Sequence, residues 1–240
     1  MKKITLLFIL LIFTVINVFA IDLSVGAGGL LGYTFTRYRL EGDDIASRQT
    51  MDRFNYGAHM FLDSKYLEFN VMIMGGRNTY SENMIYSDAN LTDSKGSGTE
   101  ASLGFALLGK YPFTLSDRMT WFPMFGIEYH IALVQKRQPE GDYVYDRTQG
   151  AFATDVDKDG NPYPLSAWNY FLVDVGAGLD YNLTGRIFLR TELLFGFRLP
   201  TGYELGALKV VKNPPMNIEN PKLAGLTGTP GLKLSAGYRL

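Results

Sequence analysis

Alternation of apolar and polar residues dominates this chain. Successive side chains of a β-strand point to opposite faces of a sheet, so a period of two predicts strands. In each segment apolar side chains alternate with glycine or polar side chains. The eight segments are 23–36, 52–62, 66–76, 99–111, 118–134, 167–181, 186–199 and 231–240. The pattern therefore predicts an all-β protein with an even number of strands.

The connections between these segments alternate in length. Short turns are predicted at 63–65, 112–117 and 182–185, and long polar loops at about 40–51, 77–98, 135–166 and 200–229. Short turns at one end and long loops at the other are typical of a transmembrane barrel with both termini in the periplasm. We therefore expect residues 21–240 to form one domain, an eight-stranded antiparallel up-and-down transmembrane β-barrel whose four long loops are extracellular.

The alternation does not say which face points outward, so a soluble barrel of the lipocalin type is the alternative. Most glycines of the predicted strands lie on the polar face, where they would pack nothing in water. In a narrow membrane barrel the same glycines face a crowded lumen and make room for large side chains. Aromatic residues of the apolar face also gather near the strand ends, as the two interfacial girdles of membrane barrels do. Both features favour the membrane barrel.

The first twenty residues have a different composition. Lys2 and Lys3 are followed by an apolar run from Ile4 to Phe19, and Ala20 provides a small residue for cleavage. This is the pattern of a secretory signal peptide. We expect residues 1–20 to be removed on export and the mature chain to reside in the outer membrane, with lipid as its first partner.

Composition excludes several other classes. The chain has no cysteine and a formal net charge of -1, so neither a disulfide framework nor a nucleic-acid partner is indicated. The glycines after residue 25 do not form a dinucleotide-binding loop, because Leu31 occupies the place of the third glycine and a strand pattern follows. No cofactor is expected.

The segment that closes the chain, "GLKLSAGYRL", keeps the alternation with Leu232, Leu234, Ala236 and Tyr238. With the leader and the eight amphipathic strands, it resembles the small outer-membrane β-barrels typified by the OmpA transmembrane domain, OmpX and OmpW. That resemblance implies a last strand that acts as an insertion signal. The final residue here is Leu240, where the family has an aromatic residue.

Charged residues of both signs lie on the predicted inner face. Ions in so narrow a space should pair, because an isolated buried charge is costly. We therefore predict a structural network of ion pairs that closes the lumen. Its members are Glu68, Glu128, Asp174, Arg186, Arg190, Glu192, Arg198 and Lys233.

Apolar residues interrupt this inner face near the long-loop end. They form either simple filler or a pocket for a small hydrophobic molecule, as the resemblance to OmpW implies. They are Leu30, Met72, Met74, Val134, Trp168, Tyr170, Leu172 and Leu194.

Catalytic and metal motifs are weak. Lipid-modifying barrels need a serine and a histidine together on the lipid-facing wall, whereas His59 and His130 are both predicted inside and neither occurs in an H-x-S pattern. We therefore expect no enzyme. Residues 155–159 resemble the start of a calcium loop, but Ser166 stands where the closing glutamate belongs, so no metal site is predicted.

Three functions remain open at this point. The first is a surface-exposed structural or adhesive barrel whose long loops meet a host or extracellular protein. The second is the binding or passage of small hydrophobic molecules through the apolar upper lumen. The third is a lipid-modifying barrel enzyme.

Overall fold

A computed structural model describes residues 23–41, 45–86, 91–140, 164–199 and 222–240. Strands make up nearly all of it, and one short 3-10 helix, η1, spans Leu165–Trp168. The strands are β1 Ser24–Glu41, β2 Ile45–Asp63, β3 Leu67–Tyr86, β4 Leu91–Lys110, β5 Phe113–Ser116, β6 Met119–Glu140, β7 Tyr170–Asn182, β8 Ile187–Arg198 and β9 Lys222–Arg239.

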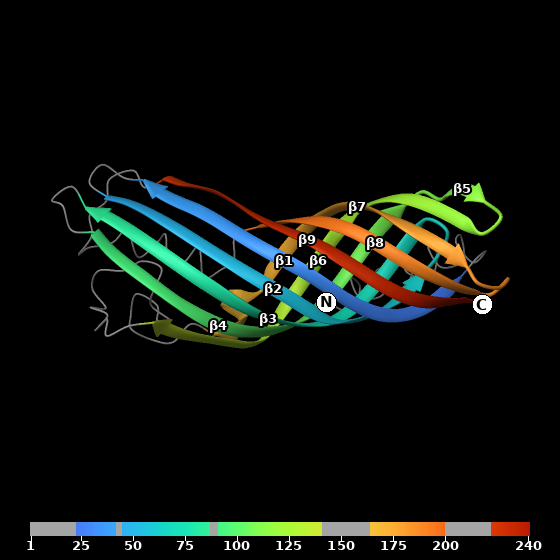
Figure 1. Ribbon diagram of the computed structural model, residues 1–240, viewed down its shortest axis with the longest axis horizontal. Helices are drawn as coiled ribbons and strands as arrows, with labels where there is room; N and C mark the ends of the chain where they lie inside the picture. Colours follow the sequence, from blue (N-terminus) through green and yellow to red (C-terminus); the bar gives the residue numbers. More distant parts are fainter. Residues whose placement is uncertain (1–22, 42–44, 87–90, 141–163, 200–221) are drawn as a thin grey trace, which may run out of the picture.

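Eight of these strands close into an antiparallel barrel (Figure 1). Neighbours in sequence pair with each other, β1 pairs with β9 along most of its length, and β4 pairs with β6 to complete the circle. The predicted up-and-down barrel is therefore confirmed. Closure leaves no free edge along the eight-stranded wall.

The wall separates apolar from polar side chains as the membrane interpretation requires. Leu193, Phe125 and Ile73 point outward with exposures of 62%, 64% and 61%. Buried positions facing the axis include fully enclosed charged residues such as Glu68 and Arg190. A soluble barrel would have the opposite arrangement, because its apolar face fills the core.

Most strands are longer than the hydrophobic pattern indicates. Parts of all four predicted long loops, 40–51, 77–98, 135–166 and 200–229, are strand: residues 40–41, 45–51, 77–86, 91–98, 135–140 and 222–229. The reason is visible at Asn78, which is buried, and Thr79, which is exposed, although both are polar. Beyond the apolar band neither face contacts lipid, so the alternation in hydropathy disappears while the backbone ladder continues.

Two local predictions near the short turns were wrong. The predicted turn 112–117 contains β5, which pairs with the start of β6 and has all four of its residues exposed. A bulge or later strand start was expected at Pro123, yet β6 begins at Met119, and Pro123 pairs with Ala177 in unbroken register. The missing proline N–H points to the side where β6 changes partner from β5 to β4. There Tyr111 N donates to Pro123 O at 3.3 Å, and only the reciprocal bond is absent.

No helix within the described residues is long and apolar enough to cross a membrane. The predicted signal peptide, 1–20, and the aspartate cluster, 155–159, both lie outside the described residues.

Candidate functional site

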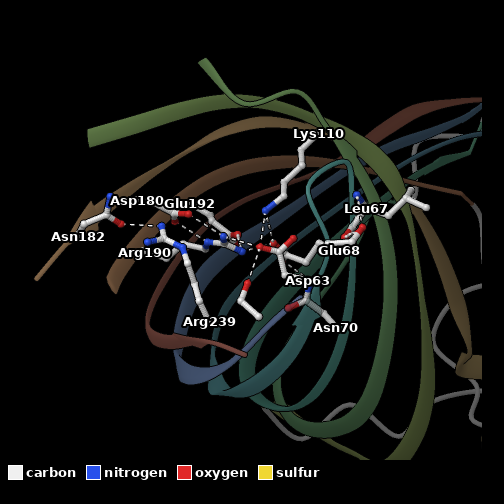
Figure 2. A network of polar contacts seen from close by, with 12 residues as sticks. Asp63, Leu67, Glu68, Asn70, Lys110, Asp180, Asn182, Arg190, Glu192 and Arg239 are labelled. Atoms are coloured by element: carbon white, nitrogen blue, oxygen red, sulfur yellow. Dashed lines mark hydrogen bonds and ion pairs between the residues drawn. The ribbon is translucent and has the colours of Figure 1, made fainter. Parts of the chain in front are cut away.

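A cluster of ion pairs fills the lumen at the short-turn end (Figure 2). Its centre is Arg190 of β8, whose side chain is 2% exposed. Arg190 Nη1 donates to Glu68 Oε2 at 2.6 Å, and Nη2 donates to Asp63 Oδ2 at 2.7 Å. Its Nε and Nη2 also donate to the two carboxylate oxygens of Asp180 at 2.7 and 2.8 Å. One guanidinium thereby joins β8 to β2, β3 and β7.

A second cation completes the cluster. Lys110 Nζ lies 2.6 Å from Asp63 Oδ2 and 3.8 Å from Glu68 Oε2. Glu192 is the next inward residue of β8 after Arg190, with 3.9 Å between its Oε1 and Arg190 Nη1. Buried carboxylates that share two cations and several hydrogen bonds are tolerable, whereas unpaired ones would not be.

Aromatic rings fill the space around this guanidinium. Arg190 Cζ lies 4.7 Å from the ring centroid of Phe61 and 5.1 Å from those of Phe122 and Phe188. Glycines on the same inner face make room for the rings, since a Cβ at Gly178 or Gly237 would overlap Phe122 or Phe188. This role of the inward glycines is the one that the sequence pattern indicated. Rings and ion pairs together close the short-turn half of the lumen.

The middle of the lumen holds a second polar cluster. His130 of β6 contacts Glu128 Oε1 through Nε2, and its Nδ1 lies 3.1 Å from Ser102 Oγ of β4. The Tyr170 ring stacks on the imidazole with centroids 4.5 Å apart and an interplanar angle of 11°. Lys233 Nζ lies 3.9 Å from Glu128 Oε2. His130 and Glu128 share β6, but Ser102, Tyr170 and Lys233 come from β4, β7 and β9, so no motif within one strand predicts the whole cluster.

A third layer lies above these residues. Arg53 forms an ion pair with Glu100 and donates from Nη2 to the Tyr170 hydroxyl at 3.3 Å and to Thr34 Oγ1 at 3.2 Å. Arg198 also lies over this ring, with 5.6 Å from its Cζ to the Tyr170 centroid. Tyr170 is thus held between two guanidinium groups and an imidazole.

The predicted apolar pocket residues only partly come together. Leu30, Met72, Met74, Leu172 and Leu194 line a lumenal cavity of about 50 Å³, which also touches Glu128, Asp174 and Lys233. Such a volume suits one or two waters or a group of a few heavy atoms. Tyr170 is buried in the layer above, against His130.

The placements of Val134 and Trp168 were wrong. Ser102 pairs with Ala132 but Ala101 pairs with Val134, so Leu133 is an extra residue in β6. A bulge of this kind reverses the alternation beyond it, and Val134 points outward with 38% of its surface exposed. Trp168 ends η1 before β7 begins and is half-exposed, because the strand alternation does not extend to it.

The predicted ionic residues lie inside the barrel with one exception. Arg186 is exposed, and its Nη1 donates to the Tyr238 hydroxyl at 2.9 Å. It belongs to the turn before β8, where the strand alternation has not yet started. Asp174 is inside, but its Oδ2 has no hydrogen-bond partner among the described residues.

Sequence reasoning missed two residues of these clusters. Asp63 was assigned to a turn, yet it is the last residue of β2 and accepts from Arg190, Lys110 and Ser24. Ser102 was placed on the inner face without a role. The only signal for it was the adjacency of the segments 99–111 and 118–134, which brings Ser102 opposite the strand that carries His130.

Fold and lumen together define a class: this is an eight-stranded transmembrane β-barrel with an apolar outer wall and a lumen closed by layers of ion pairs. Its fold is similar to that of the outer membrane protein OprG from Pseudomonas aeruginosa, with 10% identity, a TM-score of 0.43 and coverage of 91% of this chain and 95% of that one. Neisserial surface protein A matches at 9% identity and a TM-score of 0.36, covering 90% and 99%.

The attachment invasion locus protein Ail of Yersinia pestis, solved with the heparin analogue sucrose octasulfate, matches at 10% identity and a TM-score of 0.29, covering 90% and 99%. No protein-family model matches the chain, and no curated protein does so.

Proposed function

We propose that this chain is an integral outer-membrane protein whose role is carried by its long-loop end, as a surface-exposed adhesive barrel, rather than by flow through its lumen. The observation that carries the proposal is the cluster around Arg190, which spans the lumen from β8 to β3. Passage of a solute would require separating buried ion pairs such as Arg190–Glu68 and Arg190–Asp63, which is costly. We therefore assign the function to the surface at the long-loop end.

That end has its own chemistry. Above Tyr33 and Phe54 the outward positions of β1–β4 and β6 change from apolar to polar. We call this surface the polar collar; its described members are Arg37, Arg39, Asp52, Arg77, Thr79, Lys95, Thr99 and Lys136. Cations outnumber the single acid among these members. Asp52 is itself paired, with 2.7 Å between its Oδ1 and Arg37 Nη2. Because the polar collar is mainly positively charged, it favours a polyanionic partner at the cell surface.

Binding to immobilised heparin, used as a model polyanion, tests the proposal. The triple variant Arg37→Gln, Arg77→Gln and Lys95→Gln should elute at lower salt than the wild type, because screening competes with these contacts. The matched control removes three exposed cations at the opposite end, Lys65→Gln, Arg118→Gln and Arg186→Gln, and should leave elution unchanged. Equal elution of all three proteins, or no retention of the wild type, would reject an adhesive collar for polyanions.

A second candidate is the binding of a small hydrophobic molecule in the upper lumen. The apolar lining of the cavity by Leu30, Met72 and Leu172 supports it, and the volume of about 50 Å³ restricts the ligand to a few heavy atoms. The refolded wild type should then bind a small apolar solute, measured by calorimetry, more tightly than Met74→Trp, which fills the cavity. Equal binding by the two proteins would exclude this role.

A further inference from the structure

We propose that Ser102, His130 and Glu128 form a hydrolytic triad in the lumen that cleaves esters of short acyl groups. This goes beyond a surface role and departs from the expectation that the chain is not an enzyme. The imidazole of His130 lies between the other two side chains, with Nδ1 3.1 Å from Ser102 Oγ and Nε2 in contact with Glu128 Oε1. A nucleophile, a base and an acid that orients the base need this arrangement.

When the imidazole of His130 is neutral, its contacts place the one ring proton on Nε2. A carboxylate only accepts hydrogen bonds, so Glu128 takes the hydrogen of Nε2 and leaves a lone pair on Nδ1. Ser102 must therefore donate its hydroxyl hydrogen to Nδ1. That is the tautomer in which a neutral histidine accepts a proton from serine. Lys233, 3.9 Å from the second oxygen of Glu128, favours the ionised carboxylate that this scheme requires.

The surroundings hold the three side chains in place. The Tyr170 ring lies almost parallel to the imidazole, and a Cβ at Gly104 would come within 2.7 Å of His130 Cε1, so only glycine leaves room for the ring. The bulge at Leu133 adjoins Ser102, and Asn169 Oδ1 accepts the freed Ala132 N–H at 2.9 Å. Bulges often redirect side chains beside active sites. Rigid support of this kind is what a catalytic constellation needs.

The reaction has two balanced halves. Ser102 Oγ attacks the ester carbonyl carbon while its proton moves to His130 Nδ1, and the ester C–O bond then breaks as that proton passes to the leaving alcohol. Water next attacks the acyl-serine, gives a proton to Nδ1, and the proton returns to Ser102 Oγ as the carboxylic acid leaves. Arg53 pairs with Glu100, the next inward residue of β4, so a guanidinium lies in the layer next to Ser102.

The apolar cavity that reaches the triad at Glu128 limits the substrate. Met74 is the cross-strand neighbour of Ser102, and Leu172 is that of Glu128. Both line the apolar cavity of about 50 Å³, which also contacts Glu128. A cavity of this size accepts an acetyl group and excludes long acyl chains. The substrate class is therefore a short-chain acyl ester, in contrast to the acyl chains of membrane lipids.

Covalent labelling of the refolded, full-length barrel tests the triad directly. Methanesulfonyl fluoride, whose transferred group is close in size to an acetyl group, should sulfonylate Ser102 in the wild type, and p-nitrophenyl acetate should acetylate the same residue transiently, each located by peptide mass spectrometry. Ser102→Ala should abolish both modifications, and His130→Gln should slow them by about 100-fold or more. Ser235→Ala, which removes another buried lumenal serine, should react like the wild type.

Two outcomes overturn the triad. The first is an unmodified Ser102 in wild-type protein that shows the folded mobility on unboiled gels. The second is hydrolysis of p-nitrophenyl acetate by the wild type no faster than by Ser102→Ala. A purely structural hydrogen bond predicts both of these results. Heparin binding by Ser102→Ala should remain at the wild-type level. The experiments can therefore reject the triad proposal and the polar-collar proposal independently of each other.

Discussion

Arg190 and Glu68 meet at the axis of the barrel, with 2.6 Å between Nη1 and Oε2, although 122 residues separate them in sequence. Their strands, β8 and β3, lie four places apart around the eight-stranded wall and so face each other across the lumen. The contact is therefore a strut between opposite walls. Because the surrounding carboxylates also depend on Arg190, this residue should matter more to stability than any exposed ion pair.

Arg190→Leu tests that inference. Removing the guanidinium takes the shared cation from the buried carboxylates of Asp63, Glu68 and Asp180, and breaking a buried pair typically costs about 3–5 kcal/mol. We expect a correspondingly lower urea midpoint for unfolding in detergent micelles. Arg37→Leu is the control, because the exposed Arg37–Asp52 pair should contribute about 0–1 kcal/mol. Similar midpoints for the two variants would mean that the strut does not stabilise the barrel.

The sequence predicted the fold from one signal, and the limits of that signal explain what it missed. Alternation in hydropathy exists only where one face meets lipid, so it located the bilayer part of each strand and lost the extensions around Thr79. The alternation also assumes an unbroken register. The extra residue Leu133 interrupts that register, so the prediction placed Val134 on the wrong face. At strand ends too few residues alternate to show whether a side chain belongs to the strand or to the turn. Asp63 and Arg186 were misassigned for this reason.

The ionic cluster was partly predictable and the Ser102 cluster was not. Charges on the inner face of a narrow barrel must pair, so Glu68, Arg190 and Glu192 followed from their positions alone. Which acid pairs with which cation depends on the tilt and stagger of the strands. The alternation of apolar and polar residues carries no information about either. The contact between Ser102 and His130 depends in the same way on how β4 and β6 meet, the pair of strands that closes the barrel.

A pair of substitutions on β8 tests which side of the wall meets lipid. Leu193 is 62% exposed, and Leu193→Arg should hinder insertion by about 2–4 kcal/mol if the side chain lies near mid-bilayer. Gly196→Leu should instead overfill the lumen, where an added Cβ already lies 2.7 Å from Asp174 Oδ1. Refolding yield into lipid vesicles measures the first effect, and thermal unfolding of the inserted protein measures the second. Equal tolerance of both changes would contradict the orientation.

Two glycines offer a matched test of lumenal packing. At Gly237 a new Cβ overlaps the Phe188 ring, whereas at Gly109 its nearest neighbour is Phe125 O at 3.5 Å, an ordinary contact. Gly237→Ala should force Phe188 away from Arg190 and lower stability by about 1–3 kcal/mol. Gly109→Ala should change the urea midpoint little. If Gly237→Ala is equally harmless, the ring has space that the static packing does not reveal.

The direction of the barrel in the membrane gives the last prediction. The chain has no cysteine, so a single introduced thiol reports its own position without background. Thr79→Cys places the thiol on the polar collar, and Leu115→Cys places it on β5, where Leu115 is 61% exposed at the short-turn end. A membrane-impermeant maleimide should label the first variant in intact cells and the second only after the outer membrane is permeabilised. The reverse order would put the long-loop end in the periplasm and remove the basis for an adhesive collar.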